Sequence, residues 1–442
     1  MSKIQKIFKN MSWLLISQIV ASACAFIWTV LMARYLGVND YGIFGFATSL
    51  TAILLIATDF GVNTHIIRHI ATDYDSAPKY IGNAINLKVI FSIVSIFLTL
   101  ILLFIINSTD FVILITLLFL IETIIKSYLN LFNGSFQAFE VGKYQGIANT
   151  LLHLVLLLLI LISIYFDLGL LGIAISYILA NFVALVYEYY VLNKYITKPK
   201  FEFDKKFCKN ITVLSIPFAV SGILFTIYYS IDAVMLTKMV GTYATGIYNA
   251  TYKLISVLTL FYSVYTAVIF PVMSKLFKND EKTLVILFEK SIKYLMIIII
   301  PIAISTVIYS TDIIKLIYGN EYIAASPVLS ILIWTVCLLL ISGACNTLLN
   351  ASYKELTVTK IYAIAAVSNI LLNLILIPYL SYIGAAITTV MSDVIIVGLE
   401  CYIIYKLDYK PNKKLYADLI KIIIGSAILG ILLYYLKHQF LL

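Results

Sequence analysis

The sequence predicts an all-α polytopic membrane protein, and its composition and the length of its apolar runs are the first two reasons. Of its 442 residues, 62% are hydrophobic and 12% are charged, whereas soluble domains carry about 25% charged residues. Runs such as 11–33, 89–109 and 210–231 contain no Asp, Glu, Lys or Arg. A helix needs about 20 apolar residues to cross a bilayer. Because these runs are continuous rather than alternating, they favour helices over barrel strands.

An internal repeat is the third reason. Met32 to Phe44, MARYLGVNDYGIF, recurs as Leu236 to Tyr248, LTKMVGTYATGIY, at a constant offset of 204 residues. In each copy a cation precedes two glycines, which let the backbone turn between two apolar runs. Two further matches, at offsets of 212 and 217, pair Glu188 with Glu400 and Asn133 with Asn350. The chain is therefore predicted to contain two copies of one half.

Thirteen apolar segments are long enough to be transmembrane spans. We expect them at about 11–33, 41–59, 81–106, 111–133, 146–166, 170–192, 211–237, 247–271, 292–310, 326–350, 357–380, 383–405 and 416–436. Six spans from each half give twelve core spans, and the thirteenth is an addition. Pro378 and Ser381 predict a tight hairpin between the eleventh and twelfth spans.

The predicted domains follow from the repeat. Residues 1–192 form an N-terminal six-helix lobe, 193–210 a cytoplasmic linker and 211–405 a C-terminal six-helix lobe. Residues 406–442 supply a cytoplasmic loop and the extra span. Because six is an even number, both lobes begin on the same side of the membrane, which predicts a parallel repeat around a central cavity.

Basic residues lie mainly on one predicted side of the membrane. With the N-terminus in the cytoplasm, 26 of the 31 Lys and Arg residues lie on the cytoplasmic side. Those expected outside are Arg34, Lys238, Lys315 and Lys437, while Lys253 lies within a span. This pattern follows the positive-inside rule and predicts a multi-pass protein of the plasma or inner cell membrane. It also accounts for the net charge of +9 without a nucleic-acid partner, which would need a basic soluble face.

Several classes of chemistry lack their motifs. Gly142–Lys143 is followed by Tyr144 and has no upstream glycine at P-loop spacing, so no ATP site of that type is expected. The five cysteines and four histidines show no metal-binding spacing. We therefore expect no cofactor, no metal and no catalytic residue, and interpret the chain as a transporter rather than an enzyme. No loop is long enough for the outer domain that a membrane glycan polymerase or ligase would use.

Four stretches resemble a known family: ARYLGVNDYG, DAVMLTKMVGTYATGIYNATYKL, FPVMSKL and NILLNLILIPYLSYIGAAITTVMSD. They are similar to the polysaccharide-export branch of the multidrug/oligosaccharidyl-lipid/polysaccharide (MOP) superfamily, which contains the Wzx-type flippases. The resemblance covers residues 1 to about 405. It implies two pseudo-symmetric six-helix lobes in the V shape of the MATE exporters. It also implies movement of a polyprenyl-pyrophosphate-linked oligosaccharide from the inner to the outer leaflet, for surface polysaccharide or glycan assembly.

One departure narrows the implied cargo. The lipid II flippase branch has an Arg-Asp pair where this chain has Trp28 and Thr29. A peptidoglycan precursor is therefore the less favoured substrate. The sequence leaves the carrier lipid open between undecaprenyl and dolichyl chains, and membrane lipid is the other expected partner of a protein that we expect to act as a monomer.

The implied substrate indicates which side chains could bind it. Its pyrophosphate needs cations in a partly dehydrated site, and the candidates are Arg34, Lys88, Lys126, Lys238 and Lys253. Snorkelling to the interface is the alternative for Arg34 and Lys238, and a local pair with Glu122 is the alternative for Lys126. The polar cavity candidates for the glycan are Asn249, Asn369 and Asn373, which could instead bond between helices.

Acids within spans are candidates for ion coupling, because burying them is costly. Glu122 and Asp393 lie near mid-span and could carry a proton or a sodium ion. Asp232 is expected to pair with Lys253 across the seventh and eighth spans. Glu188 and Glu400 lie near the cytoplasmic ends of their spans, where we expect them to reach water.

Three interpretations follow from the sequence. The first is the lipid-linked oligosaccharide flippase, the second is a MATE-type drug/cation antiporter with the same fold, and the third is a glycan polymerase or ligase. An assay that compares binding of lipid-linked sugar with binding of organic cations separates the first two. An in vitro polymerisation assay tests the third.

Overall fold

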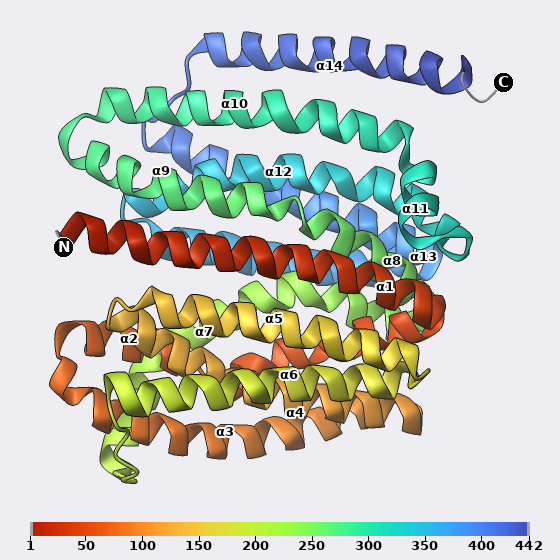
Figure 1. Ribbon diagram of the computed structural model, residues 1–442. Coiled ribbons are helices and arrows are strands. Elements are labelled where there is room, and N and C mark those ends of the chain that lie inside the picture. The colour runs from red at the N-terminus through yellow and green to blue at the C-terminus, as the bar shows by residue number, and fades with distance from the viewer. Residues whose placement is uncertain (1–2, 440–442) are drawn as a thin grey trace. The chain divides into compact units, whose positions relative to one another are not determined.

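The protein is helical throughout the part that the structure describes. The structure is a computed structural model and describes residues 3–439 (Figure 1), in which helices are present and strands are absent. Ten of the described helices are long and apolar enough to cross a membrane. The predicted all-α polytopic fold is therefore confirmed.

The described residues form two compact units that divide at Val234. The helices up to that point are α1 (Lys3–Asp59), α2 (Val62–Thr72), α3 (Ala77–Ile106), α4 (Asp110–Ala138), α5 (Gly142–Tyr165), α6 (Gly169–Val191) and most of α7 (Lys205–Met239). The second unit contains α8 (Thr242–Ser256), α9 (Thr259–Asn279), α10 (Glu281–Ile308), α11 (Ser310–Tyr318), α12 (Ser326–Ala351), α13 (Glu355–Lys406) and α14 (Lys413–Gln439). Short helical turns lie at Tyr74–Ser76, Leu192–Ile196 and Asn320–Ala325.

Two very long helices each contain two predicted spans. The 57-residue α1 bends at Gly37, where φ is 69°, and the 52-residue α13 bends at Ser381, where φ is 53°. Both bends lie in the connections predicted from the sequence. Their repeat equivalents, Gly241 and Gly169, also have positive φ values of 125° and 60°. Such values suit glycine, so the repeat in sequence corresponds to a repeat in backbone conformation.

The predicted eighth span, 247–271, is not one continuous helix. It is divided into α8 and α9, with a break at Val257 and Leu258. The Ser256 hydroxyl donates to the Lys253 carbonyl at 2.6 Å, and the Thr259 hydroxyl donates to the Ser256 carbonyl at 2.6 Å. Side chains that bond to the local backbone in this way compete with the helical pattern.

The first part of α7 belongs to the core of the first unit. Cys208 and Ile211 of α7 are buried in one apolar cluster with α2, α3 and α4. A Cβ atom on Gly61, at the start of α2, would lie 2.7 Å from the Ala219 backbone nitrogen. The compact unit therefore extends beyond the linker predicted at 193–210. The assignment of α7 to a C-terminal lobe stays a prediction from the repeat.

The thirteenth predicted span is the helix α14, which lies along α10 (Figure 1). Lys293 of α10 pairs with Asp418 of α14 at 2.7 Å. Near the other end of α14, Lys437 pairs with Asp312 at 2.6 Å and donates to the Ile308 carbonyl at 2.9 Å. Ion pairs near both ends of α14 therefore hold it against α10 and α11.

Candidate functional site

A buried ion pair connects α1 and α3 in the first unit. The Lys88 ammonium lies 2.5 Å from Asp59 Oδ1, and the Lys88 side chain is fully buried. Charges that leave water need a partner at close range, since an unpaired buried charge is very costly. Lys88, a candidate cation for pyrophosphate, is therefore held by Asp59 in this structure.

The remaining candidate cations are placed differently. Arg34, Lys126, Lys238 and Lys253 are all exposed on their helices. In this exposure they differ from Lys88, which is fully buried beside Asp59. Asp232 is buried on α7, and its predicted pair with Lys253 stays a prediction.

Glu122 is the centre of a second polar cluster in the first unit. Asn181 Nδ2 of α6 donates to Glu122 Oε1 at 3.2 Å, and the Thr123 hydroxyl donates to Oε2 at 3.4 Å. The acid is buried, yet both carboxylate oxygens have donors. The hydrogen bonds thus come from α6 and from the adjacent residue, rather than from the local partner Lys126 considered above.

Aromatic rings lie close to this cluster. Trp28 of α1 stacks on His153 of α5 with ring centroids 5.4 Å apart, and Tyr177 of α6 meets the edge of Trp28 at 6.4 Å. Phe44 and Phe119 pack against Tyr177. Rings from four helices therefore converge beside one buried carboxylate, and sequence reasoning identified none of them as part of a site. The one signal was Trp28, which the family resemblance had singled out as a departure from a related branch.

Glu188 and Glu400 are buried, contrary to the expectation that they reach water. Their exposed fractions are 1% and 0%. Their Oε2 atoms have no hydrogen-bond partner among the described residues. Their positions in the sequence indicated how far along each helix they lie, but not on which face of the helix. Their positions in the repeat, at an offset of 212 residues, were the signal that could have linked them.

Glu400 belongs to a polar cluster between α12 and α13. The Ser342 hydroxyl donates to Glu400 Oε1 at 2.9 Å. Asn346 Nδ2 donates to Ser342 Oγ at 3.2 Å and to the Tyr362 hydroxyl at 3.3 Å. We call Glu400, Ser342, Asn346 and Tyr362 the Glu400 cluster; all four are buried.

The three predicted cavity asparagines are all buried. Asn373 Nδ2 donates to Asn369 Oδ1 at 3.0 Å, one turn away on α13. Asn249 lies on α8, beside Tyr248, whose hydroxyl shares a 3.0 Å hydrogen bond with Thr389. Asp393, the predicted ion-coupling residue of α13, is half-buried. These polar groups have the burial that either interhelical bonding or a polar cavity requires, so both alternatives remain.

Hydrogen bonds hold the segment between α6 and α7 against α3. The Lys200 backbone N–H donates to the Pro78 carbonyl at 2.9 Å, and the Asp204 N–H donates to Asn83 Oδ1 at 3.0 Å. A Cβ atom on Gly82 would lie 1.7 Å from the Lys200 carbonyl oxygen, so only glycine permits this close approach. The segment is therefore fixed where it crosses α3.

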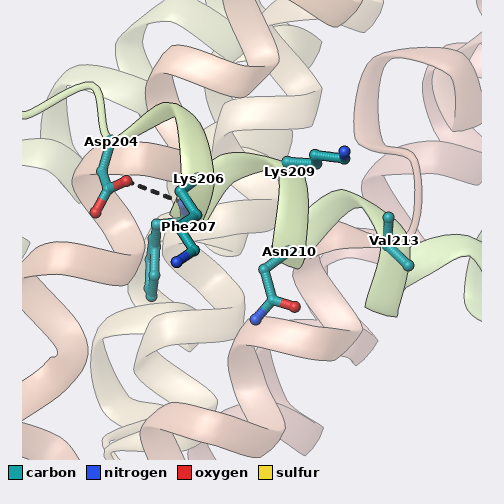
Figure 2. A pocket seen from close by; sticks show the side chains of 6 residues that line it. All are labelled: Asp204, Lys206, Phe207, Lys209, Asn210 and Val213. Carbon is teal, nitrogen blue, oxygen red and sulfur yellow. Dashed lines mark hydrogen bonds between the residues drawn. The ribbon is translucent and has the colours of Figure 1, made fainter.

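A pocket of about 670 Å³ opens beside that segment at the start of α7 (Figure 2). Lys206 and Lys209 are exposed there. The Phe207 N–H and then the Lys79 ammonium bond to Asp204, and they hold the pKa of that carboxyl below its usual value. The pocket offers cations and an amide to an anion. It is lined by Asp204, Lys206, Phe207, Lys209, Asn210 and Val213.

Comparison with known proteins places the chain in a family. The family model described as "Polysaccharide biosynthesis protein" matches residues 7–277. The chain belongs to this family. A second model, "Lipid II flippase MurJ", matches residues 231–442.

Three curated relatives cover most of this member of the polysaccharide biosynthesis family. The uncharacterized membrane protein MJ1068 of Methanocaldococcus jannaschii is 28% identical, covering 92% of this chain and 85% of its own. The capsular polysaccharide biosynthesis protein CapF of Staphylococcus aureus is 25% identical, covering 90% of this chain and 99% of its own. The probable low-salt glycan biosynthesis flippase Agl15 of Haloferax volcanii is 23% identical, covering 86% and 79%.

Solved structures share the fold of this family member. The lipid II flippase MurJ in an inward closed conformation aligns with a TM-score of 0.78 and 16% identity, covering 96% of this chain and 92% of that one. An inward-facing multidrug resistance MATE family transporter of the MOP superfamily aligns with a TM-score of 0.70 and 15% identity, covering 89% and 96%. The resemblance to a polysaccharide-export family inferred from the four sequence stretches is confirmed by the family model, and these structures show that the fold is shared.

Proposed function

We propose that this protein is a flippase that moves a polyprenyl-pyrophosphate-linked oligosaccharide from the inner to the outer leaflet. The observation that carries the proposal is membership of the polysaccharide biosynthesis family over residues 7–277. Relatives named for capsular polysaccharide and for glycan flipping support the same substrate class. The product serves assembly of a surface polysaccharide or glycan, and the protein acts as a transporter rather than as an enzyme.

The substrate meets cations where it enters and where it leaves. Its pyrophosphate pairs favourably with lysine in a partly dehydrated site. The pocket at the start of α7 presents Lys206 and Lys209 (Figure 2). Arg34 and Lys238 are exposed at the ends of their spans that are predicted to lie on the outer side of the membrane. They therefore suit later contacts with the pyrophosphate. The buried asparagines Asn249, Asn369 and Asn373 are the proposed contacts of the glycan, and the apolar tail stays in lipid.

The proposed orientation places the N-terminus in the cytoplasm of a cell whose plasma or inner membrane holds the protein. The distribution of basic residues supports it. Asn107 and Asn320 lie in connections that we place outside, and both are exposed. In a variant lacking the five native cysteines, single cysteines at Asn107 and Asn320 are expected to react with an impermeant thiol reagent added to intact cells. Protection of both positions, with labelling only after permeabilisation, would reverse the orientation.

Transport is proposed to proceed by a monomer without ATP, either downhill or coupled to a cation gradient. Glu122 and Asp393 are the residues that we propose for a proton or a sodium ion. A bound cation would offset part of the free-energy cost of placing an ionised carboxylate within the membrane.

Binding by the purified protein tests the substrate class. A synthetic polyprenyl-pyrophosphate oligosaccharide is expected to bind saturably, and the double variant Lys206→Gln/Lys209→Gln is expected to bind it more weakly. A double variant of exposed lysines that do not line that pocket, Lys413→Gln/Lys414→Gln, is the matched control. Saturable binding of organic cations with no affinity for the lipid-linked sugar would contradict the proposal and favour the antiporter.

A further inference from the structure

A second pocket, of about 290 Å³, opens between α3, α4 and α6 of the first unit. Every residue that lines it is apolar or aromatic. Val186 and Phe201, two of these residues, are 53% and 60% exposed, so the pocket is open at the surface of helices that are long and apolar enough to cross a membrane. An apolar chain is therefore the ligand that it favours. The lining includes Ile85 of α3, Tyr128 and Phe132 of α4, Val186 and Tyr189 of α6, and Phe201 of the segment between α6 and α7.

The part of this pocket that Phe201 forms is fixed on α3. Phe201 lies in an irregular stretch of backbone between α6 and α7. Just before it, the Lys200 N–H donates to the Pro78 carbonyl at 2.9 Å. Just after it, the Glu202 carbonyl accepts from Asn86 Nδ2 of α3 at 3.2 Å. Because the backbone is held on both sides of Phe201, the pocket is a built feature of the first unit.

Unpaired cations lie next to Phe201 in the chain. Residues 194–206 contain five lysines and two acids, and one of the acids, Asp204, already pairs with a lysine of α3 at 3.1 Å. Lys198 and Lys200 are exposed, and neither forms an ion pair with any described residue. A phosphate pairs well with such ammonium groups. The surroundings of the pocket therefore suit a ligand with an anionic head and an apolar chain.

We propose that this pocket, together with Lys198 and Lys200, binds an anionic phospholipid of the cytoplasmic leaflet. The phosphate pairs with the two ammonium groups, and part of one acyl chain lies in the pocket. Basic segments beside membrane spans attract anionic lipids of that leaflet. The volume of about 290 Å³ is at the lower end of ligand pockets, about 300–1,000 Å³, and suits a segment of one chain.

This ligand differs from the proposed cargo. The pocket lining has no amide, carboxylate or ammonium group that would bind a sugar, so a lipid without a glycan fits it better. The bound lipid would contact three helices with its chain and the segment between α6 and α7 with its phosphate. It would therefore stabilise the first unit. The proposal goes beyond the flippase activity and does not depend on it.

Thermal unfolding of the full-length protein in detergent micelles is the first test. Phosphatidylglycerol, phosphatidylcholine and inorganic phosphate are added in separate titrations. A ligand that binds only the folded state raises the melting temperature in a concentration-dependent way. We expect a saturable rise with phosphatidylglycerol, a smaller rise with phosphatidylcholine and no rise with inorganic phosphate, because binding needs both the charge and the chain.

A lysine variant tests the contact with the phosphate. Lys198→Gln/Lys200→Gln is expected to need roughly 25-fold more phosphatidylglycerol for half of the shift, because each lysine near an anionic surface changes the affinity about fivefold. Its response to phosphatidylcholine is expected to stay unchanged. Lys413→Gln/Lys414→Gln is the matched control, since these lysines are also exposed and do not line the pocket.

A variant that fills the pocket tests the contact with the chain. Val186→Trp is expected to lose the saturable shift with phosphatidylglycerol. Native mass spectrometry is expected to show that it retains one phosphatidylglycerol fewer than the wild type. Val94→Trp is the matched control, because Val94 of α3 is 47% exposed and does not line the pocket.

Three results would overturn the proposal. The first is an equal shift with phosphatidylglycerol and phosphatidylcholine in the wild type. The second is an unchanged phosphatidylglycerol shift in both the lysine variant and Val186→Trp. The third is displacement of the retained phosphatidylglycerol by an equimolar polyprenyl-pyrophosphate oligosaccharide, which would assign the pocket to the cargo. If Val186→Trp does not fold, the lysine variant and native mass spectrometry decide the matter.

Discussion

Glu122 and Glu400 are both glutamates buried inside helical bundles, one in each unit, and they differ in their partners. Glu122 accepts a hydrogen bond on each oxygen, from Asn181 and from Thr123. Glu400 accepts one bond from Ser342, and its second oxygen has no partner among the described residues. Side chains of the first unit therefore satisfy both oxygens of Glu122, whereas one oxygen of Glu400 accepts no hydrogen bond from the described residues.

The inventory of buried charges differs in the same way. The first unit buries Lys88 beside Asp59, and it also buries Glu122, Glu188 and Asp232. Of the described residues in the second unit, Glu400 is the only Asp, Glu, Lys or Arg that is buried. Positive φ values repeat at Gly37 and Gly241 and at Gly169 and Ser381, and the buried acids Glu188 and Glu400 are also related by the repeat. The buried Lys88 and Glu122 of the first unit have no buried charged counterpart among the described residues of the second.

The largest effect is expected at the buried ion pair of the first unit. Lys88→Met leaves Asp59 without its cation, which is expected to cost about 3–5 kcal/mol of stability. The double variant Lys88→Met/Asp59→Asn should recover most of that loss. Lys293→Met, which breaks the partly exposed pair with Asp418, should cost much less stability, because solvent screens an exposed ion pair. Unfolding curves in detergent micelles measure all three, and an equal loss for both single variants would contradict the contrast.

A smaller effect is expected at the Glu122 cluster. Asn181→Leu removes the donor to Glu122 Oε1, and an unsatisfied buried acceptor costs about 1–3 kcal/mol. Adding Glu122→Met should restore stability, because the acceptor is then gone as well. Unfolding curves in detergent micelles measure the stability of both variants. Normal stability of Asn181→Leu alone would mean that Glu122 does not depend on its internal donors, and the comparison with Glu400 would fail.

The smallest effect is expected at His65, which is buried beside a second histidine. Burial and then the nearby His69 lower the pKa of His65 on α2, and the two rings lie 4.4 Å apart. The unfolded chain therefore takes up the proton first. Stability is complete above the ordinary pKa of about 6.5 and is lost as the pH falls from there toward the lower folded pKa. His65→Gln should lose less stability than the wild type across this window, as measured by pH-dependent unfolding. Identical pH profiles would remove His65 from the account.

Run length and composition predicted the positions of the helices, because the bilayer sets a minimum length that few other sequences meet. They did not predict the break between α8 and α9, where the Ser256 and Thr259 hydroxyls bond to nearby backbone carbonyls. Turn residues were informative where the backbone has positive φ, as at Gly37 and Ser381.

The candidate sites were harder to predict, because they join residues far apart in the chain. Lys88 and Asp59 are 29 positions apart, and Glu122 and Asn181 are 59 apart. A sequence shows which residues are polar within a span but not which face they occupy. That is why Glu188 and Glu400 were expected to meet water and are buried instead. Among the sequence observations, only the repeat related these two acids to each other.

Translocation of a lipid-linked sugar tests the central claim most directly. The purified protein would be reconstituted into vesicles that carry a fluorescent polyprenyl-pyrophosphate oligosaccharide, and an impermeant quencher would report the fraction in the outer leaflet over time. We expect the protein to make the inner-leaflet pool accessible to the quencher, and a fluorescent phospholipid to stay inaccessible in parallel vesicles. Vesicles in which the labelled oligosaccharide stays as protected as in protein-free controls, with correctly folded protein present, would contradict the account.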